Sequence, residues 1–323
     1  MRNLLQQTRM ELLPENTILS SPKFANSLAS IPDLRPGAHP LVREREDAFE
    51  AYYEVDYDPE FGAFWAKLRP DGPKNFTPEL VAALRQGQVR VENRVRDELD
   101  SGREDRLRYQ ILTSRIPGVF SLGGDLALFR KLIRNQDGDA LLRYACACID
   151  LVYTNAVNYK LPVVTISLIQ GQALGGGFEA ALAANVVVAE KQSKLGLPEV
   201  MFNMFPGMGA YQLLTRRLTP ARAEELILSG RTYGAEELYQ MGLVDVLAEP
   251  GEGEKAVMQY IKKRHRLFHA AQGLRGAIQA ASPLDYGALI RVAEAWVRQA
   301  LGLKERDLEL MDYLVRAQQR MQQ

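Results

Sequence analysis

The chain has 323 residues, of which 46% are hydrophobic and 25% are charged, as is typical of globular proteins. Its 40 Lys and Arg residues are balanced by 40 Asp and Glu residues, so the formal net charge is zero. Proteins that bind nucleic acids or anionic membrane surfaces carry an excess of basic residues. The charge balance therefore argues against both of these classes.

The chain also lacks the signals of export and membrane insertion. Its N-terminal residues contain no apolar segment of the kind found in secretory signal peptides. The longest uncharged stretch, residues 161–178, contains Pro162 and several glycines, which favours a buried strand and a turn over a membrane-spanning helix. Cys146 and Cys148 lack the spacing of a zinc site, which favours reduced thiols in a cytoplasmic protein.

Periodicity divides the chain into three parts. Residues 1–46 show little periodicity and many prolines, which predicts an irregular N-terminal arm. Strand and helix patterns alternate over residues 47–250, which predicts an α/β core with parallel strands, and residues 251–323 form a helical C-terminal region. The expected strands cover residues 48–58, 62–70, 106–115, 161–171, 185–190 and 243–249. The expected helices cover residues 77–101, 125–135, 139–159, 175–184, 219–230, 234–242, 254–281, 284–302 and 305–323.

Three short segments of the core carry the residues of a candidate site. Residues 120–126 read FSLGGDL and residues 171–179 read GQALGGGFE. Each has the pattern of a strand, a glycine turn and a helix, in which the backbone can approach a ligand and the first helical N–H groups are free. One N–H group from each turn would form an oxyanion hole. The third segment, residues 197–209, supplies Glu199 on a turn fixed by Pro198.

A pair of carboxylates accompanies these turns. Glu179 lies just inside the helix after the second turn, between apolar residues. Such surroundings partly desolvate a carboxyl group, which raises its pKa and suits it to proton transfer. One predicted strand separates Glu179 from Glu199, so a sheet could bring both to one site. The second turn matches neither GxGxxG nor GxxxxGK[ST] spacing, which argues against a dinucleotide or phosphate loop.

In this order, the three segments resemble the crotonase (enoyl-CoA hydratase/isomerase) superfamily over roughly residues 50–250. The stretches FEAALAANVVVAE and LGLPEVMFNMFPGMGAYQLLTRRL are similar to the bacterial diffusible-signal-factor synthases. Ordinary hydratases have a GAGGT-like turn where this chain has GMGAY at 207–211, and often Cys-Asp where it has Ala-Asn at 184–185. The resemblance implies the crotonase fold, an α/β spiral of ββα units followed by a helical region that supports trimers.

The resemblance also implies roles for particular residues. The oxyanion-hole amides fall on Gly124 and Gly176, with a slip of one residue to Gly123 or Gly175 left open. The two catalytic carboxylates fall on Glu179 and Glu199, and we favour Glu199 as the base for the C2 proton. The residues expected to bind the substrate and its acyl tail are Met208, Trp296 and Leu314.

By resemblance, the reaction is dehydration of a 3-hydroxyacyl thioester followed by thioester hydrolysis, which releases a cis-2-unsaturated fatty acid signal. The substrate is carried by acyl carrier protein or coenzyme A, and no other cofactor is expected. The expected partners are further copies of the chain, in a homotrimer or a dimer of trimers, and the receiver domain of a sensor kinase. The alternatives are an enoyl-CoA hydratase or isomerase of fatty-acid metabolism, and a crotonase-fold binding protein that has lost catalysis.

The remaining chemistry-bearing residues give weaker patterns. His265 and His269 have the i,i+4 spacing of metal ligands on a helix, but their segment HRLFH lacks the glutamate of an HExxH site. We expect a solvated or packing pair and no metal. No GxSxG motif or Ser/His/Asp pattern is present in the sequence.

Overall fold

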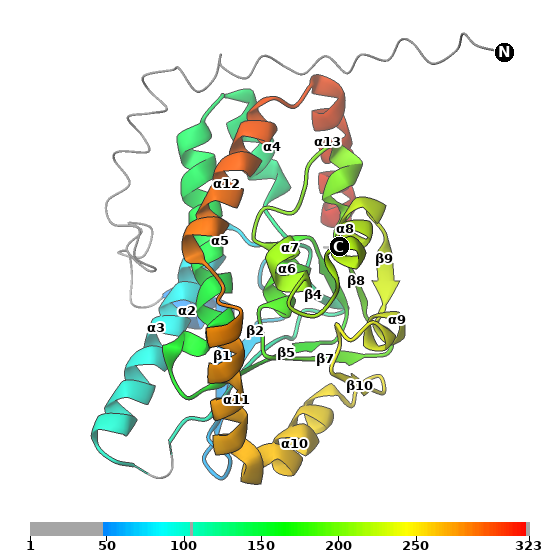
Figure 1. The fold of residues 1–323 in the computed structure, drawn as a ribbon. Coiled ribbons are helices and arrows are strands. Elements are labelled where there is room, and N and C mark those ends of the chain that lie inside the picture. Colours follow the sequence, from blue (N-terminus) through cyan, green and yellow to red (C-terminus); the bar gives the residue numbers. More distant parts are fainter. Residues whose placement is uncertain (1–47, 104–105, 321–323) are drawn as a thin grey trace, which may run out of the picture.

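The computed structural model describes residues 48–103 and 106–320. The predicted N-terminal arm, residues 1–46, lies outside the described residues. No helix in the described part of the chain is long and apolar enough to cross a membrane. Figure 1 shows two sheets at the centre of the molecule, with helices around them.

The larger sheet has six strands in the order β1-β2-β3-β5-β7-β10. Its strands are β1 (Tyr53–Asp58), β2 (Ala63–Leu68), β3 (Tyr109–Ser114), β5 (Val164–Ile169), β7 (Val186–Glu190) and β10 (Val246–Ala248). Every neighbouring pair is parallel except β1 and β2, which form an antiparallel hairpin. The predicted parallel α/β core is therefore confirmed, with one antiparallel strand at its edge.

The smaller sheet has four strands in the order β4-β6-β8-β9, and three of them lead into the segments singled out above. Its strands are β4 (Val119–Ser121), β6 (Gln172–Leu174), β8 (Lys194–Gly196) and β9 (Thr232–Gly234). The first three are parallel, so their carboxyl ends meet at one edge of the sheet. Periodicity did not reveal these strands, because three-residue strands are too short to show it.

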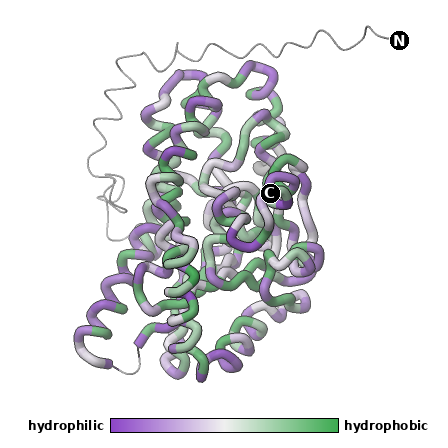
Figure 2. The backbone as a smooth tube through the Cα atoms, viewed as in Figure 1, coloured by the Kyte–Doolittle hydropathy of each residue, from purple (hydrophilic) through white to green (hydrophobic). Residues whose placement is uncertain are grey.

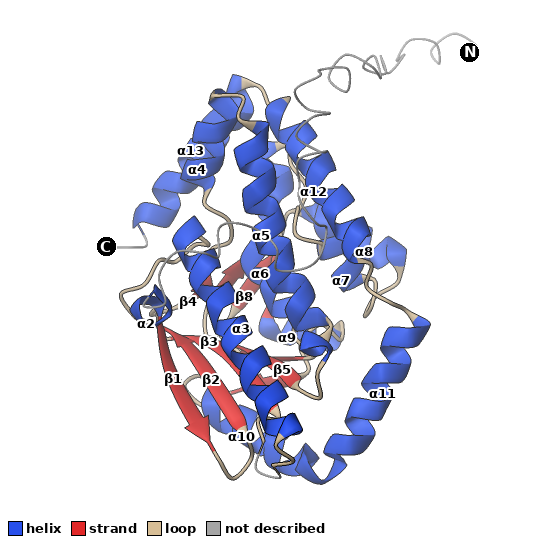
Figure 3. Ribbon diagram, turned by 90° about the vertical axis from the view of Figure 1, so that its left-hand side faces the viewer, coloured by secondary structure: helices blue, strands red, loops and turns tan. Residues whose placement is uncertain are grey.

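Helices cover both faces of the larger sheet. The helices are α2 (Ala48–Tyr52), α3 (Pro78–Asp100), α4 (Leu126–Arg134), α5 (Gly138–Ala156), α6 (Gly176–Leu182), α7 (Ala210–Leu214), α8 (Pro220–Ser229), α9 (Ala235–Gln240), α10 (Gly253–Arg264), α11 (Phe268–Ala281), α12 (Tyr286–Leu301) and α13 (Glu305–Arg320). Short 3₁₀ helices occur as η2 (Asn158–Lys160), η3 (Pro198–Phe202) and η4 (His265–Leu267). The long helices α3, α5 and α12 run side by side (Figure 3).

Alternating residues of the strands contribute to two separate cores. Ile111 and Val188 pack with residues of α10, whereas Leu112 and Val187 belong to the core that contains α5. Because both faces are covered, every residue of β3, β5 and β7 is buried, and the interior is largely apolar (Figure 2). Leu112 is 7% exposed and the other three are at most 1% exposed.

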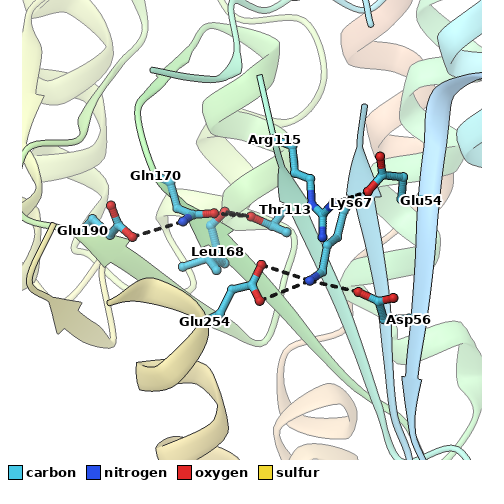
Figure 4. A network of polar contacts seen from close by, with 9 residues as sticks. All are labelled: Glu54, Asp56, Lys67, Thr113, Arg115, Leu168, Gln170, Glu190 and Glu254. Carbon is cyan, nitrogen blue, oxygen red and sulfur yellow. Dashed lines mark hydrogen bonds and ion pairs between the residues drawn. The ribbon is translucent and has the colours of Figure 1, made fainter. Parts of the chain in front are cut away.

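Polar side chains hold the start of α10 against the sheet (Figure 4). Lys67, which is buried at the end of β2, contacts both Asp56 and Glu254 at 3.0 Å. Glu190 at the end of β7 accepts a hydrogen bond from the Gly253 backbone at 3.0 Å. The C-terminal helical region therefore begins at a fixed position on the core, close to the predicted boundary.

The structure corrects three details of the predicted elements. Residues 48–52 form the short helix α2, where a strand was expected; the aromatic residues there suit either structure. The predicted helix 254–281 is broken by η4 into α10 and α11. The strand β9 is antiparallel to β8, and it was not expected at all.

Candidate active site

One cavity of about 280 Å³ brings together the residues that the sequence singled out. Its lining residues come from the helices α4, α5, α6, α12 and α13 and from the turns before them. The predicted site residues that line it are Gly124, Gly176, Glu179, Glu199, Met208, Trp296 and Leu314, together with the alternatives Gly123 and Gly175. The rest of the lining is mainly apolar, so a group inside this cavity is shielded from water.

The first glycine turn connects β4 to α4. Gly123 has a φ of +90°, and a Cβ atom there would lie 2.6 Å from the carbonyl oxygen of Leu174, so the turn requires glycine. Asp125 then caps α4 by accepting a hydrogen bond from Leu128 N at 3.0 Å. The turn is thus held at both ends, and Gly124 lies between them.

Hydrogen bonding fixes the direction of the Gly124 N–H group. The Gly123 carbonyl belongs to the same peptide unit and accepts a hydrogen bond from Phe76 N at 2.8 Å. In a trans peptide the C=O and N–H bonds point in opposite directions, so Phe76 on one side directs the N–H to the other. No acceptor for the Gly124 N–H group occurs among the residues that the structure describes.

The second glycine turn connects β6 to α6 and places a further N–H group beside the first. Gly176 is the first residue of α6, so its N–H group has no acceptor within the helix. A Cβ atom on Gly176 would lie 3.7 Å from Gly124 N. Both N–H groups therefore border the same small volume, which is the arrangement that stabilises an oxyanion.

Glu179 lies one turn into α6 and is 1% exposed. Its Oε1 atom accepts hydrogen bonds from Met208 N and Ala210 N, both at 2.9 Å. Burial raises the pKa of the Glu179 carboxyl well above its usual range, and the nearby charge of Glu199 raises it further, while the two N–H donors oppose the shift. The raised pKa agrees with the prediction from its apolar sequence neighbours.

Glu199 enters the cavity from η3, which begins at Pro198. Its Oε2 atom is buried and has no hydrogen-bond partner in the described residues. Burial raises the pKa of this carboxyl as well. Gly175, with a φ of +53°, allows the approach, because a Cβ atom there would lie 2.6 Å from Glu199 Oε1. Two carboxyl groups with raised pKa values thus share one apolar cavity, and mutual repulsion favours their holding a proton between them.

Apolar side chains close the other end of the cavity. The Trp296 ring meets Phe129 edge to face at a centroid distance of 5.1 Å, and Phe129 meets Tyr144 in the same way at 5.2 Å. A Cβ atom on Gly207 would lie 2.7 Å from Trp296, so glycine there leaves room for the indole. Leu314 of α13 completes this wall.

Ion pairs connect α13, which carries Leu314, to α4. Arg130 pairs with Asp312, and Arg134 pairs with Glu305. The C-terminal helices therefore form part of the cavity wall as well as an outer layer.

Sequence reasoning missed several residues of the site. Phe76 and the backbone of Ala210 contribute through N–H groups, which leave no signal in residue type. Tyr144 and Cys148 also line the cavity, but in the sequence they read as ordinary core residues of a helix. Only the packing of α5 against the turns shows their position.

The histidine and cysteine residues singled out in the sequence lie outside any metal site in the described part of the chain. The His265 ring lies 2.9 Å from Arg108 and packs against Phe61, which agrees with the expected packing role. No group of three or more His, Cys, Asp or Glu side chains within residues 48–103 and 106–320 has the arrangement of a metal site. Cys146 and Cys148 are buried free thiols.

Comparisons with known proteins place the chain in a family. Rat mitochondrial methylglutaconyl-CoA hydratase is 30% identical over 229 residues, which cover 69% of this chain and 70% of the rat protein. The structure of human mitochondrial delta3-delta2-enoyl-CoA isomerase matches with a TM-score of 0.66 at 20% identity, over 83% of this chain and 99% of the human chain. Pseudomonas aeruginosa DspI matches with a TM-score of 0.57 at 22% identity, over 76% and 93% of the two chains.

A family model completes the comparison. The model of the family "Enoyl-CoA hydratase/isomerase" matches residues 82–275, which contain both glycine turns and both carboxylates. The fold neighbours above confirm the predicted crotonase fold, with its helical C-terminal region. The chain therefore belongs to the enoyl-CoA hydratase/isomerase family, the crotonases.

Proposed function

We propose that this enzyme dehydrates a 3-hydroxyacyl thioester and then hydrolyses the thioester, releasing a cis-2-unsaturated fatty acid. The observation that carries the proposal is the convergence of two free backbone N–H groups and two buried carboxyl groups on one apolar cavity. The sequence similarity to the signal synthases around both glutamates supports the choice of reaction. As the similarity implies, the product would act as a diffusible signal between bacterial cells.

The oxyanion hole prepares the substrate for loss of its C2 proton. A thioester oxygen placed between Gly124 N and Gly176 N accepts both hydrogen bonds as negative charge develops on it. Glu199 then removes the C2 proton, since its Oε2 atom is free of other partners. Each oxyanion donor in such a site contributes about 10²- to 10³-fold to the rate.

Glu179 supplies the proton for the departing hydroxyl group at C3. Its Oε1 atom already accepts two backbone hydrogen bonds, so a proton on the neutral carboxyl resides on Oε2. That proton is donated to the hydroxyl as the C3–O bond breaks, and water leaves. Ionised Glu179 then takes a proton from a water molecule as that water attacks the thioester carbon in the same oxyanion hole. The C–S bond breaks, and the carrier leaves as a thiol with the proton held by Glu199.

These steps need only proton transfers and water as a nucleophile, so we propose that the enzyme needs no cofactor besides the carrier of the acyl group. The carrier is acyl carrier protein or coenzyme A. We place the enzyme in the cytoplasm, where both carriers occur. The wall formed by Phe129, Trp296 and Leu314 would hold the acyl tail, and Met208 would border the reacting carbons.

We further propose assembly into a trimer or a dimer of trimers. Large apolar side chains of the C-terminal region are exposed at Leu267 (54%), Leu274 (63%) and Ile278 (47%), in or beside α11. Helix α11 extends away from the sheets (Figure 3). Burial of these side chains against another copy would remove them from water. The receiver domain of a sensor kinase is proposed as a second partner, from the sequence similarity alone.

A second candidate function is enoyl-CoA hydration or isomerisation. It is favoured by the identity to rat methylglutaconyl-CoA hydratase and uses the same carboxylates and oxyanion hole. A binding protein without catalysis is the third candidate, and the presence of both glutamates in the cavity argues against it.

Mass spectrometry of the products separates these candidates. The purified enzyme is incubated with 3-hydroxyacyl thioesters of acyl carrier protein and of coenzyme A, with Glu199→Gln as the control. Release of a free cis-2-enoic acid by the wild type, but not by Glu199→Gln, supports the proposal. Interconversion of enoyl and 3-hydroxyacyl thioesters without free acid would replace it by the hydratase function, and no turnover of any thioester would indicate a binding protein.

A further inference from the structure

The hydroxyl group of Tyr144 holds the backbone segment that contacts the first glycine turn. Tyr144 lies in α5, and its side chain is buried. Its hydroxyl donates a hydrogen bond to the Phe76 carbonyl oxygen, 68 positions away in the sequence. Phe76 N in turn donates to the Gly123 carbonyl oxygen.

Phe76 therefore connects Tyr144 to the peptide unit of Gly124. Phe76 and Gly124 form an isolated parallel bridge, in which Phe76 N donates to the Gly123 carbonyl at 2.8 Å. The peptide unit that presents the Gly124 N–H group is thus held by Phe76, and the carbonyl group of Phe76 is held by the Tyr144 hydroxyl.

We propose that Tyr144 is a positioning residue of the oxyanion hole, whose hydroxyl aligns the Gly124 N–H group with the thioester oxygen. The inference rests on the oxyanion role given to Gly124 in the proposed function. Tyr144 acts through the backbone, because its one hydroxyl proton is already donated to Phe76. Oxyanion stabilisation depends on donors that are oriented before the reaction begins, so a small rotation of this peptide reduces the rate.

The ring and the hydroxyl of Tyr144 have separable tasks. The ring packs edge to face against Phe129, at a centroid distance of 5.2 Å, and it belongs to the main core. Tyr144→Phe keeps this packing and removes the oxygen only. The Phe76 carbonyl then loses its hydrogen-bond donor, and the Phe76 segment relaxes together with the glycine turn that it holds.

Tyr153→Phe is the matched control. Tyr153 lies in the same helix and is 9% exposed, and its ring packs against Tyr286. No hydrogen bond of its hydroxyl occurs within the described part of the chain. Both variants remove one phenol hydroxyl from α5, but only Tyr144→Phe removes a hydrogen bond to the segment that holds the turn.

The test compares steady-state kinetics with the infrared spectrum of a bound enoyl thioester labelled with ¹³C at its carbonyl. In Tyr144→Phe we expect kcat to fall roughly 10- to 100-fold with little change in KM, as for a weakened oxyanion donor. The carbonyl stretch, which shifts to lower frequency when oxyanion donors polarise the bond, should return toward its value in solution. Tyr153→Phe should match the wild type in both measurements.

Several outcomes would overturn the inference. A carbonyl stretch and kcat at wild-type values in Tyr144→Phe would show that the hydroxyl supports only the fold. If Tyr144→Phe does not fold, replacement by difluorotyrosine keeps the shape and strengthens the donor, and an unchanged carbonyl frequency in that protein refutes the inference.

The same spectra distinguish this inference from the proposed function. A carbonyl shift that depends on Tyr144, in an enzyme that releases no cis-2-enoic acid, would uphold the positioning role and reject the synthase reaction. A wild-type protein that leaves the bound carbonyl unshifted would reject the oxyanion hole and the positioning role together.

Discussion

Substitution of Gly176 by alanine separates catalysis from stability at this site. Gly176 has ordinary helical backbone geometry at the start of α6, so alanine is allowed there. The added methyl group would lie 2.8 Å from Met208 Sδ and 3.7 Å from Gly124 N. Met208 is flexible and can move, whereas the Gly124 backbone is held by the bridge to Phe76. The methyl group therefore occupies the space between the two amides, where the thioester oxygen must lie.

The substitution should have opposite effects on catalysis and on the stability of the fold. Displacing the oxyanion from one donor costs about 10²- to 10³-fold in kcat, equivalent to about 2.7–4 kcal/mol of transition-state stabilisation. Replacing glycine by alanine where the backbone allows it stabilises the fold by about 0.4–1 kcal/mol, because the unfolded chain loses entropy, and this offsets the strain of moving Met208. Activity should therefore be lost while the free energy of unfolding stays within about 1 kcal/mol of the wild type.

The assay measures kcat and KM on a 3-hydroxyacyl thioester, and thermal unfolding on the same samples. Gly287→Ala in α12 is the control, since its methyl group would meet only the flexible ends of Asp285 and Arg291. Wild-type kcat in a folded Gly176→Ala protein would refute the assignment of this space to the oxyanion. A large loss of stability would instead show that the packing around Met208 is rigid.

Further predictions concern the carboxylates, the tail wall and the thiols. Glu179→Gln and Glu199→Gln should each lower dehydration by about 10²-fold or more in kinetic assays, and full activity in both would refute the mechanism. Because burial raises both pKa values in the folded state, the folded chain binds protons more tightly than the unfolded chain. The contribution of these two groups to stability should therefore be complete below the ordinary Glu pKa of about 4.3, and it should be lost as the pH rises to neutrality and above. Glu179→Gln should make the free energy of unfolding less dependent on pH, as denaturant titrations would show. Leu314→Arg should raise KM for long acyl chains far more than for short ones, since each buried methylene contributes about 0.8 kcal/mol, and equal effects at every length would reject the tail wall. Burial raises the pKa of Cys148 to about 12, so iodoacetamide should alkylate this thiol only after unfolding, as peptide mapping would show.

Much of the site was visible in the sequence because it depends on local conformation. Glycine turns between strands and helices have characteristic patterns, and they located the two backbone segments and Glu179 that line the cavity. The apolar neighbours of Glu179 also predicted its raised pKa, since α6 is a core helix whose other faces are buried. The alternating strands and helices predicted the sheet of parallel strands, because period and length distinguish these elements even in a single sequence.

Tertiary structure alone decided how these parts are combined. The distance between Glu179 and Glu199, and the hydrogen bonds from Met208 N and Ala210 N, follow from the meeting of parallel strand ends at one sheet edge. The role of the Tyr144 hydroxyl depends on a contact with Phe76 across 68 positions of the chain. Backbone N–H groups are the same for every residue type except proline, and long-range packing has no period, so neither leaves a signal in the sequence.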